Sequence, residues 1–222
     1  MARNKLERFE ENKTFPHFFE YRYENGISDF LLKGKWNDAF FKNDKPIIIE
    51  LGCGKGEYTT GFGLKYPDKN FIGFDIKGSR MWVGAKKSFD KQMKNIAFVR
   101  MYISLINAVF GKNEVDEIWI TFPDPHLRKS KSKKRLTSPD FINRYVQFLK
   151  PKGIIHLKTD SIELYDYTME VISSNNYYLH CSSVDVYQNN ISPASDIQTY
   201  YEQIWLSQGL TIKYISFSPN YK

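Results

Sequence analysis

Residues 47–56, with the sequence IIIELGCGKG, decide the fold of this chain. The β-branched run at 47–49 is typical of a buried strand, and the glycines after it predict a turn of the kind that binds nucleotides. Their spacing is G-x-G-x-G, whereas NAD-binding turns have G-x-G-x-x-G, and Glu50 precedes them. Gly52 and Gly54 let a ligand lie close to the backbone, and a carboxylate favours a cationic ligand. S-adenosylmethionine, a sulfonium that carries an ammonium group, fits this pattern.

The composition predicts one substantial soluble domain. The chain has 222 residues, of which 41% are hydrophobic and 16% are aromatic. Cys53 and Cys181 lie far apart and the first residues form no apolar signal region, so we expect a reducing, cytoplasmic setting. No apolar run approaches the roughly 20 residues that span a bilayer. The net charge of +7 and the pI near 9.2 favour a polyanionic partner.

Strand and helix patterns alternate along the chain. We expect strands at 47–51, 70–75, 96–100, 117–121, 153–159, 179–186 and 210–217. Helix-length stretches separate the first five, including residues 78–90 and a stretch after Ser138, which with Pro139 forms a good helix start. This alternation predicts an α/β fold with a doubly wound, mostly parallel, seven-stranded sheet covered on both faces. Ligands of such sheets bind beyond the carboxyl ends of the strands.

Residues 1–40 differ from the domain that we expect at 41–222. In this N-terminal extension basic and aromatic residues interleave, from Arg3 and Lys5 to Phe19 and Tyr23. Such a segment can stack bases and hold phosphates, but it can equally form a strap packed on the domain surface.

Three acids follow predicted strands. Asp75 ends the second strand, where doubly wound folds place an acid that accepts hydrogen bonds from ribose hydroxyls; it can instead cap the next helix. Asp124 lies in a stiff F-P-D-P turn at 122–125, because prolines on both sides restrict its backbone. Asp160 follows the fifth strand, although it or Ser161 can merely cap a helix. We expect these carboxylates to meet at one edge of the sheet.

A basic run follows the F-P-D-P turn. Between His126 and Arg135 there are six basic residues and no acid. They are Arg128, Lys129, Lys131, Lys133, Lys134 and Arg135. Such a run is often only a solvated loop, but here it would place phosphate-binding groups beside the candidate site. Near the carboxyl end, residues 199–202 have the T-x-x-E form of a capping box, which by itself indicates only a helix start.

Four motifs together resemble the bacterial tRNA (guanine-N7)-methyltransferase family. They are E-L-G-C-G-K-G at 50–56, F-P-D-P with its basic tail at 122–136, K-T-D at 158–160 and T-Y-Y-E at 199–202. The resemblance implies a class I methyltransferase fold whose last strand is antiparallel. It also implies methyl transfer from S-adenosylmethionine to the variable-loop guanine at position 46 of tRNA.

The resemblance also implies roles for individual residues. The cofactor side comprises Glu50, Gly52, Gly54, Asp75, Tyr102 and Asp124, and the catalytic acids are Asp124 and Asp160. The substrate side comprises Arg128, Asp160, Thr199, Tyr200, Tyr201 and Glu202. Tyr102 stands where many members have an acid that contacts the adenosine, so we expect it to border or stack on the adenine. His126 replaces a common tryptophan, and we expect a turn or phosphate-binding role for it.

The implied mechanism is direct in-line transfer to N7, a ring nitrogen with a lone pair and no proton to remove. Asp160 or Glu202 would accept hydrogen bonds from the guanine N1 and N2 protons and favour the cationic product. We expect no metal, no membrane, and a monomer or homodimer without an obligate protein partner. The alternatives are methylation of another RNA base or position or of DNA, a non-catalytic RNA-binding protein, and an NAD-dependent oxidoreductase.

Overall fold

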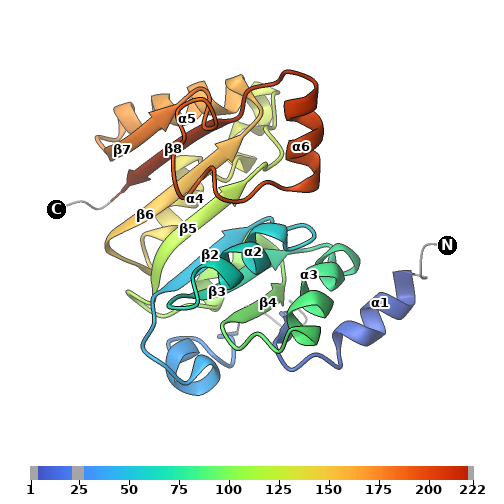
Figure 1. Cartoon of the computed structure of the whole chain (residues 1–222). Helices are drawn as coiled ribbons and strands as arrows, with labels where there is room; N and C mark the ends of the chain where they lie inside the picture. The colour runs from blue at the N-terminus through green and yellow to red at the C-terminus, as the bar shows by residue number, and fades with distance from the viewer. Residues whose placement is uncertain (1–4, 22–27, 220–222) are drawn as a thin grey trace.

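The computed structural model describes residues 5–21 and 28–219, and eight strands in these residues form one sheet (Figure 1). The strands are β1 (Phe18–Glu20), β2 (Ile47–Leu51), β3 (Asn70–Asp75), β4 (Ile96–Arg100), β5 (Val115–Thr121), β6 (Leu149–Thr159), β7 (Tyr178–Ser183) and β8 (Lys213–Ser218). Their order is β1-β4-β3-β2-β5-β6-β8-β7, with β1 to β6 parallel and β8 antiparallel to both neighbours. The predicted α/β fold with its mostly parallel sheet and antiparallel last strand is confirmed.

The strand order reverses at β2. This strand pairs in parallel with β3 on one side and with β5 on the other, so that Glu50 lies opposite Gly73 and Trp119. In doubly wound sheets, ligands bind beyond the carboxyl ends of the strands at such a reversal. The glycine-rich turn that follows β2 therefore lies at the expected binding point.

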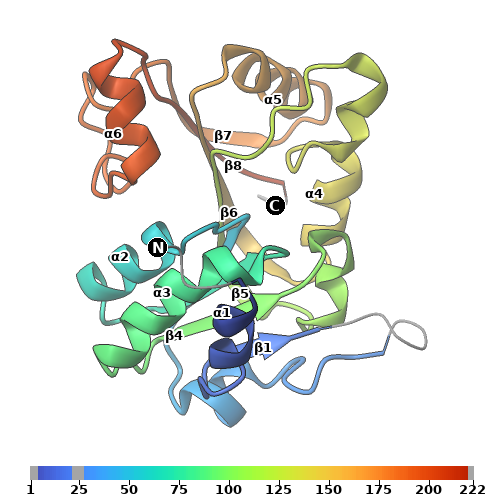
Figure 2. The ribbon, with the colours of Figure 1, turned by 90° about the vertical axis from the view of Figure 1, so that its right-hand side faces the viewer.

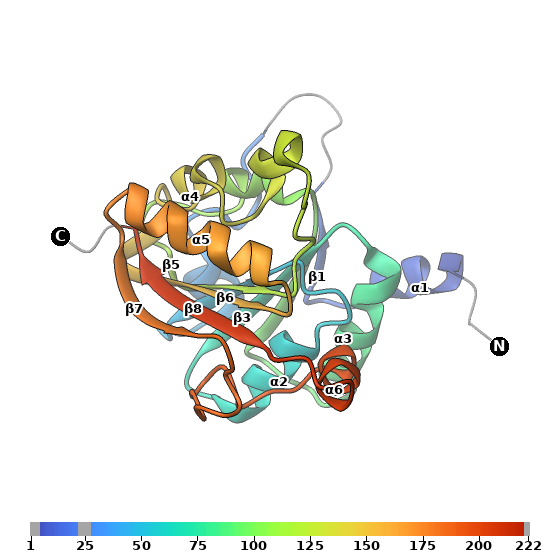
Figure 3. The ribbon, with the colours of Figure 1, turned by 90° about the horizontal axis from the view of Figure 1, so that it is seen from above.

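Alternate residues of β2 face two separate cores. Ile47, Ile49 and Leu51 pack with α4 (Pro139–Tyr145) and α5 (Ile162–Ser174). Ile48 packs on the opposite face with α2 (Glu57–Lys65) and α3 (Gly78–Asp90). The strand is buried throughout, and apolar except at Glu50, because helices cover both faces, as Figure 3 shows.

The N-terminal segment adds the strand that raises the count from the expected seven to eight. β1 pairs with β4, and α1 (Lys5–Asn12) packs on α3 (Figure 2). The Asn12 side-chain amide donates to the Gly78 carbonyl at 2.9 Å. β1 has only three residues, too few to show the period-2 pattern of a strand. Residues 5–21 thus pack on the domain; Arg3 and Tyr23 lie outside the described residues.

The remaining segments are short. They are a π-helical turn (Trp36–Phe41), 3₁₀ turns at Ile103–Ala108 and Lys129–Lys134, and α6 (Tyr200–Ser207). β7 ends before the expected residue 186 because the Asp185 carboxylate accepts hydrogen bonds from the Tyr187 and Gln188 amides, which forms a turn. Within the described ranges, no helix has both the length and the apolar character needed to cross a bilayer.

Candidate active site

The glycine-rich turn leaves open space beside its backbone. Gly52 and Gly54 have φ angles of +80° and +54°, and a Cβ atom at either position would meet no atom of the described residues within 4 Å. A Cβ atom at Gly56 would instead lie 2.7 Å from the Phe98 ring. The first two glycines thus leave room for a ligand, whereas the third allows the turn to pack against the sheet and α3.

Asp75 ties this turn to the end of β3. Its carboxylate accepts hydrogen bonds from the Gly54 amide at 2.9 Å and the Lys77 amide at 2.8 Å. Lys77 precedes the first turn of α3, so Asp75 does not cap the orphan amides of that helix. Each carboxylate oxygen can still accept a further hydrogen bond, which binding of ribose hydroxyls by Asp75 would require.

Glu50 supports the turn from inside the molecule. It is buried, and its carboxylate accepts hydrogen bonds from the Thr59 amide at 2.9 Å, the Thr59 hydroxyl at 2.5 Å and the Thr121 hydroxyl at 2.7 Å. Burial raises the pKa of Glu50 to about 7, against the lowering effect of these hydrogen bonds. One of the roughly four acceptor sites of the carboxylate, on Oε1, remains for a ligand.

Tyr102 lies at the same edge of the sheet. It follows β4 and begins a 3₁₀ turn, and 64% of the residue is exposed. The preceding amide, that of Met101, donates to the Asp75 carbonyl at 3.0 Å. The ring is therefore accessible next to the acid that binds the glycine turn.

The F-P-D-P turn holds Asp124 toward solvent. Phe122 and His126, on either side, have φ angles of +48° and +44°, which are uncommon for residues with a side chain. The Phe122 amide donates to the Lys158 carbonyl at 2.8 Å, and the His126 amide donates to the Asp124 carboxylate at 3.0 Å. Because 74% of the Asp124 side chain is exposed, its carboxylate is presented in a fixed turn, and His126 serves as a turn residue.

One member of the basic run has a structural role that the sequence analysis missed. Arg135 is buried, and its guanidinium donates to the Pro125 carbonyl at 3.0 Å and to the His126 carbonyl at 3.2 Å. The guanidinium also lies 4.1 Å from the Tyr167 ring centroid. Arg135 therefore braces the F-P-D-P turn, and this corrects its assignment to a phosphate-binding group. The exposed members are Arg128, Lys129, Lys131, Lys133 and Lys134.

The Asp160 carboxylate is available to a ligand. Within residues 5–21 and 28–219, no group hydrogen bonds to it or pairs with it, although its backbone carbonyl accepts from Lys213 at 3.1 Å. The Ser161 hydroxyl accepts from the Leu164 amide at 3.2 Å and is the N-cap of α5. Ser161, and not Asp160, therefore caps α5, so the Asp160 side chain has no capping role.

Residues 199–202 form the predicted capping box, but Glu202 is buried rather than presented to a ligand. Its carboxylate forms an ion pair with Lys158, and neither residue is exposed. Burial lowers the pKa of Lys158 to about 8, and the Glu202 charge opposes this shift. In this conformation Glu202 cannot contact a base, which differs from the role implied by the family resemblance.

The neighbouring tyrosines are exposed and face the glycine turn. Tyr200 and Tyr201 are 56% and 51% exposed, and the Lys55 ammonium lies 5.2 and 5.6 Å from their ring centroids. Trp205 continues this surface, with its ring 4.9 Å from that of Phe122. Aromatic rings from α6 thus border both the glycine turn and the F-P-D-P turn. The sequence analysis placed Lys55 and Phe122 in the two turns but assigned no role to them or to Trp205.

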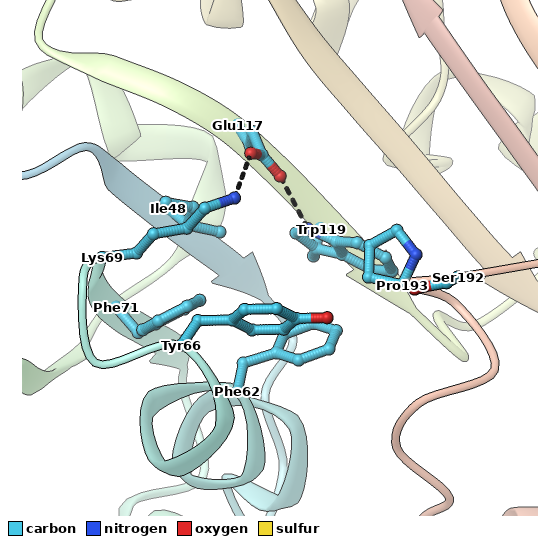
Figure 4. A pocket seen from close by; sticks show the side chains of 9 residues that line it. All are labelled: Ile48, Phe62, Tyr66, Lys69, Phe71, Glu117, Trp119, Ser192 and Pro193. Atoms are coloured by element: carbon cyan, nitrogen blue, oxygen red, sulfur yellow. Dashed lines mark hydrogen bonds and ion pairs between the residues drawn. The ribbon is translucent and has the colours of Figure 1, made fainter.

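A separate hollow lies away from this edge (Figure 4). It has a volume of about 220 Å³ and is lined in part by aromatic rings, including Phe62, Tyr66 and Trp119, with the Lys69–Glu117 ion pair at one side. Glu117 lies toward the start of β5. None of the predicted site residues lines this hollow, and no group of His, Cys, Asp and Glu in the described ranges could hold a metal ion.

Comparisons with known proteins agree with this arrangement. A family described as putative methyltransferase matches residues 44–215. A tRNA (guanine-N(7)-)-methyltransferase of Bacteroides thetaiotaomicron is 51% identical over 98% of this chain and 86% of its own length. A protein of the same name from Christiangramia forsetii is 49% identical over 97% of this chain and 98% of its own length.

Solved structures show the same fold at low sequence identity. The 16S rRNA methyltransferase KamB has a TM-score of 0.60 at 12% identity, with 78% of this chain and 87% of KamB covered. An antibiotic-related methyltransferase has a TM-score of 0.58 at 16% identity, with 80% and 89% covered. The chain therefore belongs to the class I methyltransferases, in the family whose members are named tRNA (guanine-N(7)-)-methyltransferase.

Proposed function

We propose that this protein transfers a methyl group from S-adenosylmethionine to N7 of the variable-loop guanine at position 46 of tRNA. Relatives about 50% identical over nearly the whole chain carry the name of this activity at guanine N7. The observation that carries the proposal is the unpartnered Asp160 carboxylate, at the same sheet edge as a glycine turn with open space beside it.

The cofactor would lie against the glycine turn. The absence of Cβ atoms at Gly52 and Gly54 leaves space for it, and Asp75 has acceptor capacity for ribose hydroxyls. Tyr102 offers an exposed ring for the adenine, and Glu50 offers the remaining acceptor site of Oε1 beneath the turn. The cofactor supplies a methyl group on a positively charged sulfur.

The target guanine would lie between this edge and α6. Guanine N7 carries a lone pair, so the protein needs no base to remove a proton there. Asp160 accepts hydrogen bonds from the N1 and N2 protons, which adenine cannot supply in the same arrangement, and thereby selects guanine. The Asp124 carboxylate, at the boundary of cofactor and target, stabilises the positive charge that develops on the purine. Tyr200 and Tyr201, which follow Thr199, offer rings on which the base can stack.

The tRNA backbone would lie over the exposed part of the basic run. Arg128, Lys129, Lys131, Lys133 and Lys134 are all exposed and follow Asp124 directly, so phosphates bound there would lie next to the target base. Arg135 is excluded from this surface because it is buried. A tRNA substrate would place the reaction in the cytoplasm.

Product analysis tests this proposal. The purified protein is incubated with S-adenosylmethionine and an unmodified tRNA transcript, the RNA is digested to nucleosides, and methylated products are identified by mass spectrometry. We expect 7-methylguanosine. A different methylated nucleoside would contradict the proposed target, whereas cofactor binding without any product would exclude a tRNA guanine as the substrate under these conditions.

A further inference from the structure

Lys158 and Glu202 form a buried charge pair where four segments of the chain meet. Both side chains are 0% exposed. Lys158 lies near the end of β6, and Glu202 lies in the first turn of α6. The Lys158 ammonium also donates to the Ala194 carbonyl at 2.7 Å, in the loop before α6, and to the Tyr58 hydroxyl at 2.5 Å, in α2. The pair thus connects the sheet and the helix after the glycine turn with the carboxyl-terminal segment.

Partners inside the protein surround the Glu202 carboxylate on both oxygens. Oε1 contacts the Lys158 ammonium and accepts from the Tyr187 hydroxyl at 2.5 Å. Oε2 accepts from the Thr199 amide at 3.1 Å and lies 3.3 Å from the Tyr58 hydroxyl, whose one proton can instead go to the Ile197 carbonyl at 3.0 Å. Because Glu202 is 0% exposed, neither oxygen is open to a substrate. Direct contact with a guanine would require this network to break.

Such a pair is a poor means of adding stability. Desolvation of two charges offsets much of their attraction, and well-packed apolar residues in the same place are often equally stable. What a buried pair with fixed hydrogen-bond directions can supply is a single arrangement of the segments that carry it. Here those segments are β6, α2, α6 and the loop before α6.

The arrangement that the pair fixes concerns the aromatic rings at the site. Tyr200 and Tyr201 follow the N-cap Thr199, whose amide is bound by Glu202. Their rings lie over Lys55, in the glycine turn that leads into α2. A shift of the first turn of α6 would therefore move both rings relative to the cofactor turn.

We propose that Lys158 and Glu202 are positioning residues: their buried ion pair holds the start of α6 so that Tyr200 and Tyr201 receive the target base, and Glu202 itself does not contact tRNA. This inference rests on the proposed function. It assigns the carboxyl-terminal T-Y-Y-E motif an indirect part in tRNA binding, through the orientation of its two tyrosines.

The test is a double-mutant cycle with Lys158→Met, Glu202→Gln and the double variant. Each single variant leaves one buried group without its partner, whereas the double variant is neutral. Its glutamine oxygen can still accept from the Thr199 amide, and its NH2 group can donate to the Tyr187 hydroxyl. We expect Lys158→Met to raise the KM for tRNA by roughly tenfold or more, with the cofactor Kd within about twofold of wild type. The double variant should recover to within about threefold of wild type.

Lys150→Met is the matched control. It makes the same substitution on the same strand, at the other end of β6, where Lys150 pairs with Asp116 at 2.8 Å and is 43% exposed. Its KM for tRNA should stay within about twofold of wild type, because an exposed pair contributes little.

The outcomes separate the alternatives. A folded double variant that binds cofactor normally but is as inactive as Glu202→Gln would show that the carboxylate contacts the base, and would overturn the inference. Recovery in the double variant supports it, even where a single variant fails to fold. Failure of the proposed function itself would appear earlier, as wild-type protein that forms no 7-methylguanosine.

Discussion

Replacing Gly54 by alanine tests whether the glycine turn is the cofactor site. Gly54 has a φ angle of +54°, and an added Cβ atom would meet no described atom within 4 Å. The substitution therefore costs only left-handed backbone strain, about 1–2 kcal/mol. For a chain of this length, that lowers Tm by roughly 2–8 °C. If the open space belongs to the cofactor, the methyl group also intrudes on it and costs about 1–3 kcal/mol of binding, or roughly 5- to 150-fold in Kd.

Gly209 provides a matched control. Its φ angle is +76°, and an added Cβ atom there also meets no atom of the described ranges within 4 Å. Gly209→Ala should lower Tm by a similar amount because the strain is the same. Its affinity for S-adenosylmethionine, measured by isothermal titration calorimetry, should stay at the wild-type value. Equal cofactor affinity in the Gly54→Ala and Gly209→Ala proteins would refute the assignment of the turn as the cofactor site.

Three further predictions concern the acids and the basic run. Asp160→Ala should abolish methyl transfer in a product assay and leave the cofactor Kd, measured by calorimetry, nearly unchanged. A loss of cofactor affinity as large as the loss of activity would contradict the assignment of Asp160 to the target base. Neutralising Lys133 and Lys134 should weaken tRNA binding and reduce the slope of the logarithm of the tRNA association constant against the logarithm of the salt concentration by up to roughly two. Arg135→Met should lower activity and leave that slope unchanged, because Arg135 is buried. Because the folded pKa of Glu50 is raised from 4.5 to about 7, its stabilising contribution is present below pH 4.5 and is lost as the pH rises through 7. In urea unfolding between pH 4.5 and 8, the free energy of unfolding of wild type should therefore fall by about 3 kcal/mol more than that of Glu50→Gln. Parallel plots of unfolding free energy against pH for the two proteins would contradict this.

Features that depend on local pattern were predictable from the sequence. The strands at 47–51, 70–75 and 96–100 have the predicted bounds, because their apolar runs end at glycines or charged residues. The capping box at Thr199 likewise forms as predicted, since its two hydrogen bonds join residues three positions apart.

Features that depend on distant partners were not predictable in the same way. Arg135 lies in a run of lysines that looks solvated, and its burial depends on turn carbonyls before it and on Tyr167 in α5. Glu202 was correctly placed in a cap, but the local pattern does not show the Lys158 ammonium that buries its charge. The one available signal was Lys158 itself, since a lysine near the end of a strand whose sheet is covered on both faces requires a buried acceptor.

Locating the methyl group within the RNA tests the central claim most directly. The protein is incubated with S-adenosylmethionine and a tRNA transcript that has guanine at position 46, and nuclease fragments are sequenced by mass spectrometry. The account predicts one 7-methylguanosine, at position 46, and no methylation of a transcript that has adenine there. Methylation that persists in the adenine transcript, or that occurs at another position, would contradict the account.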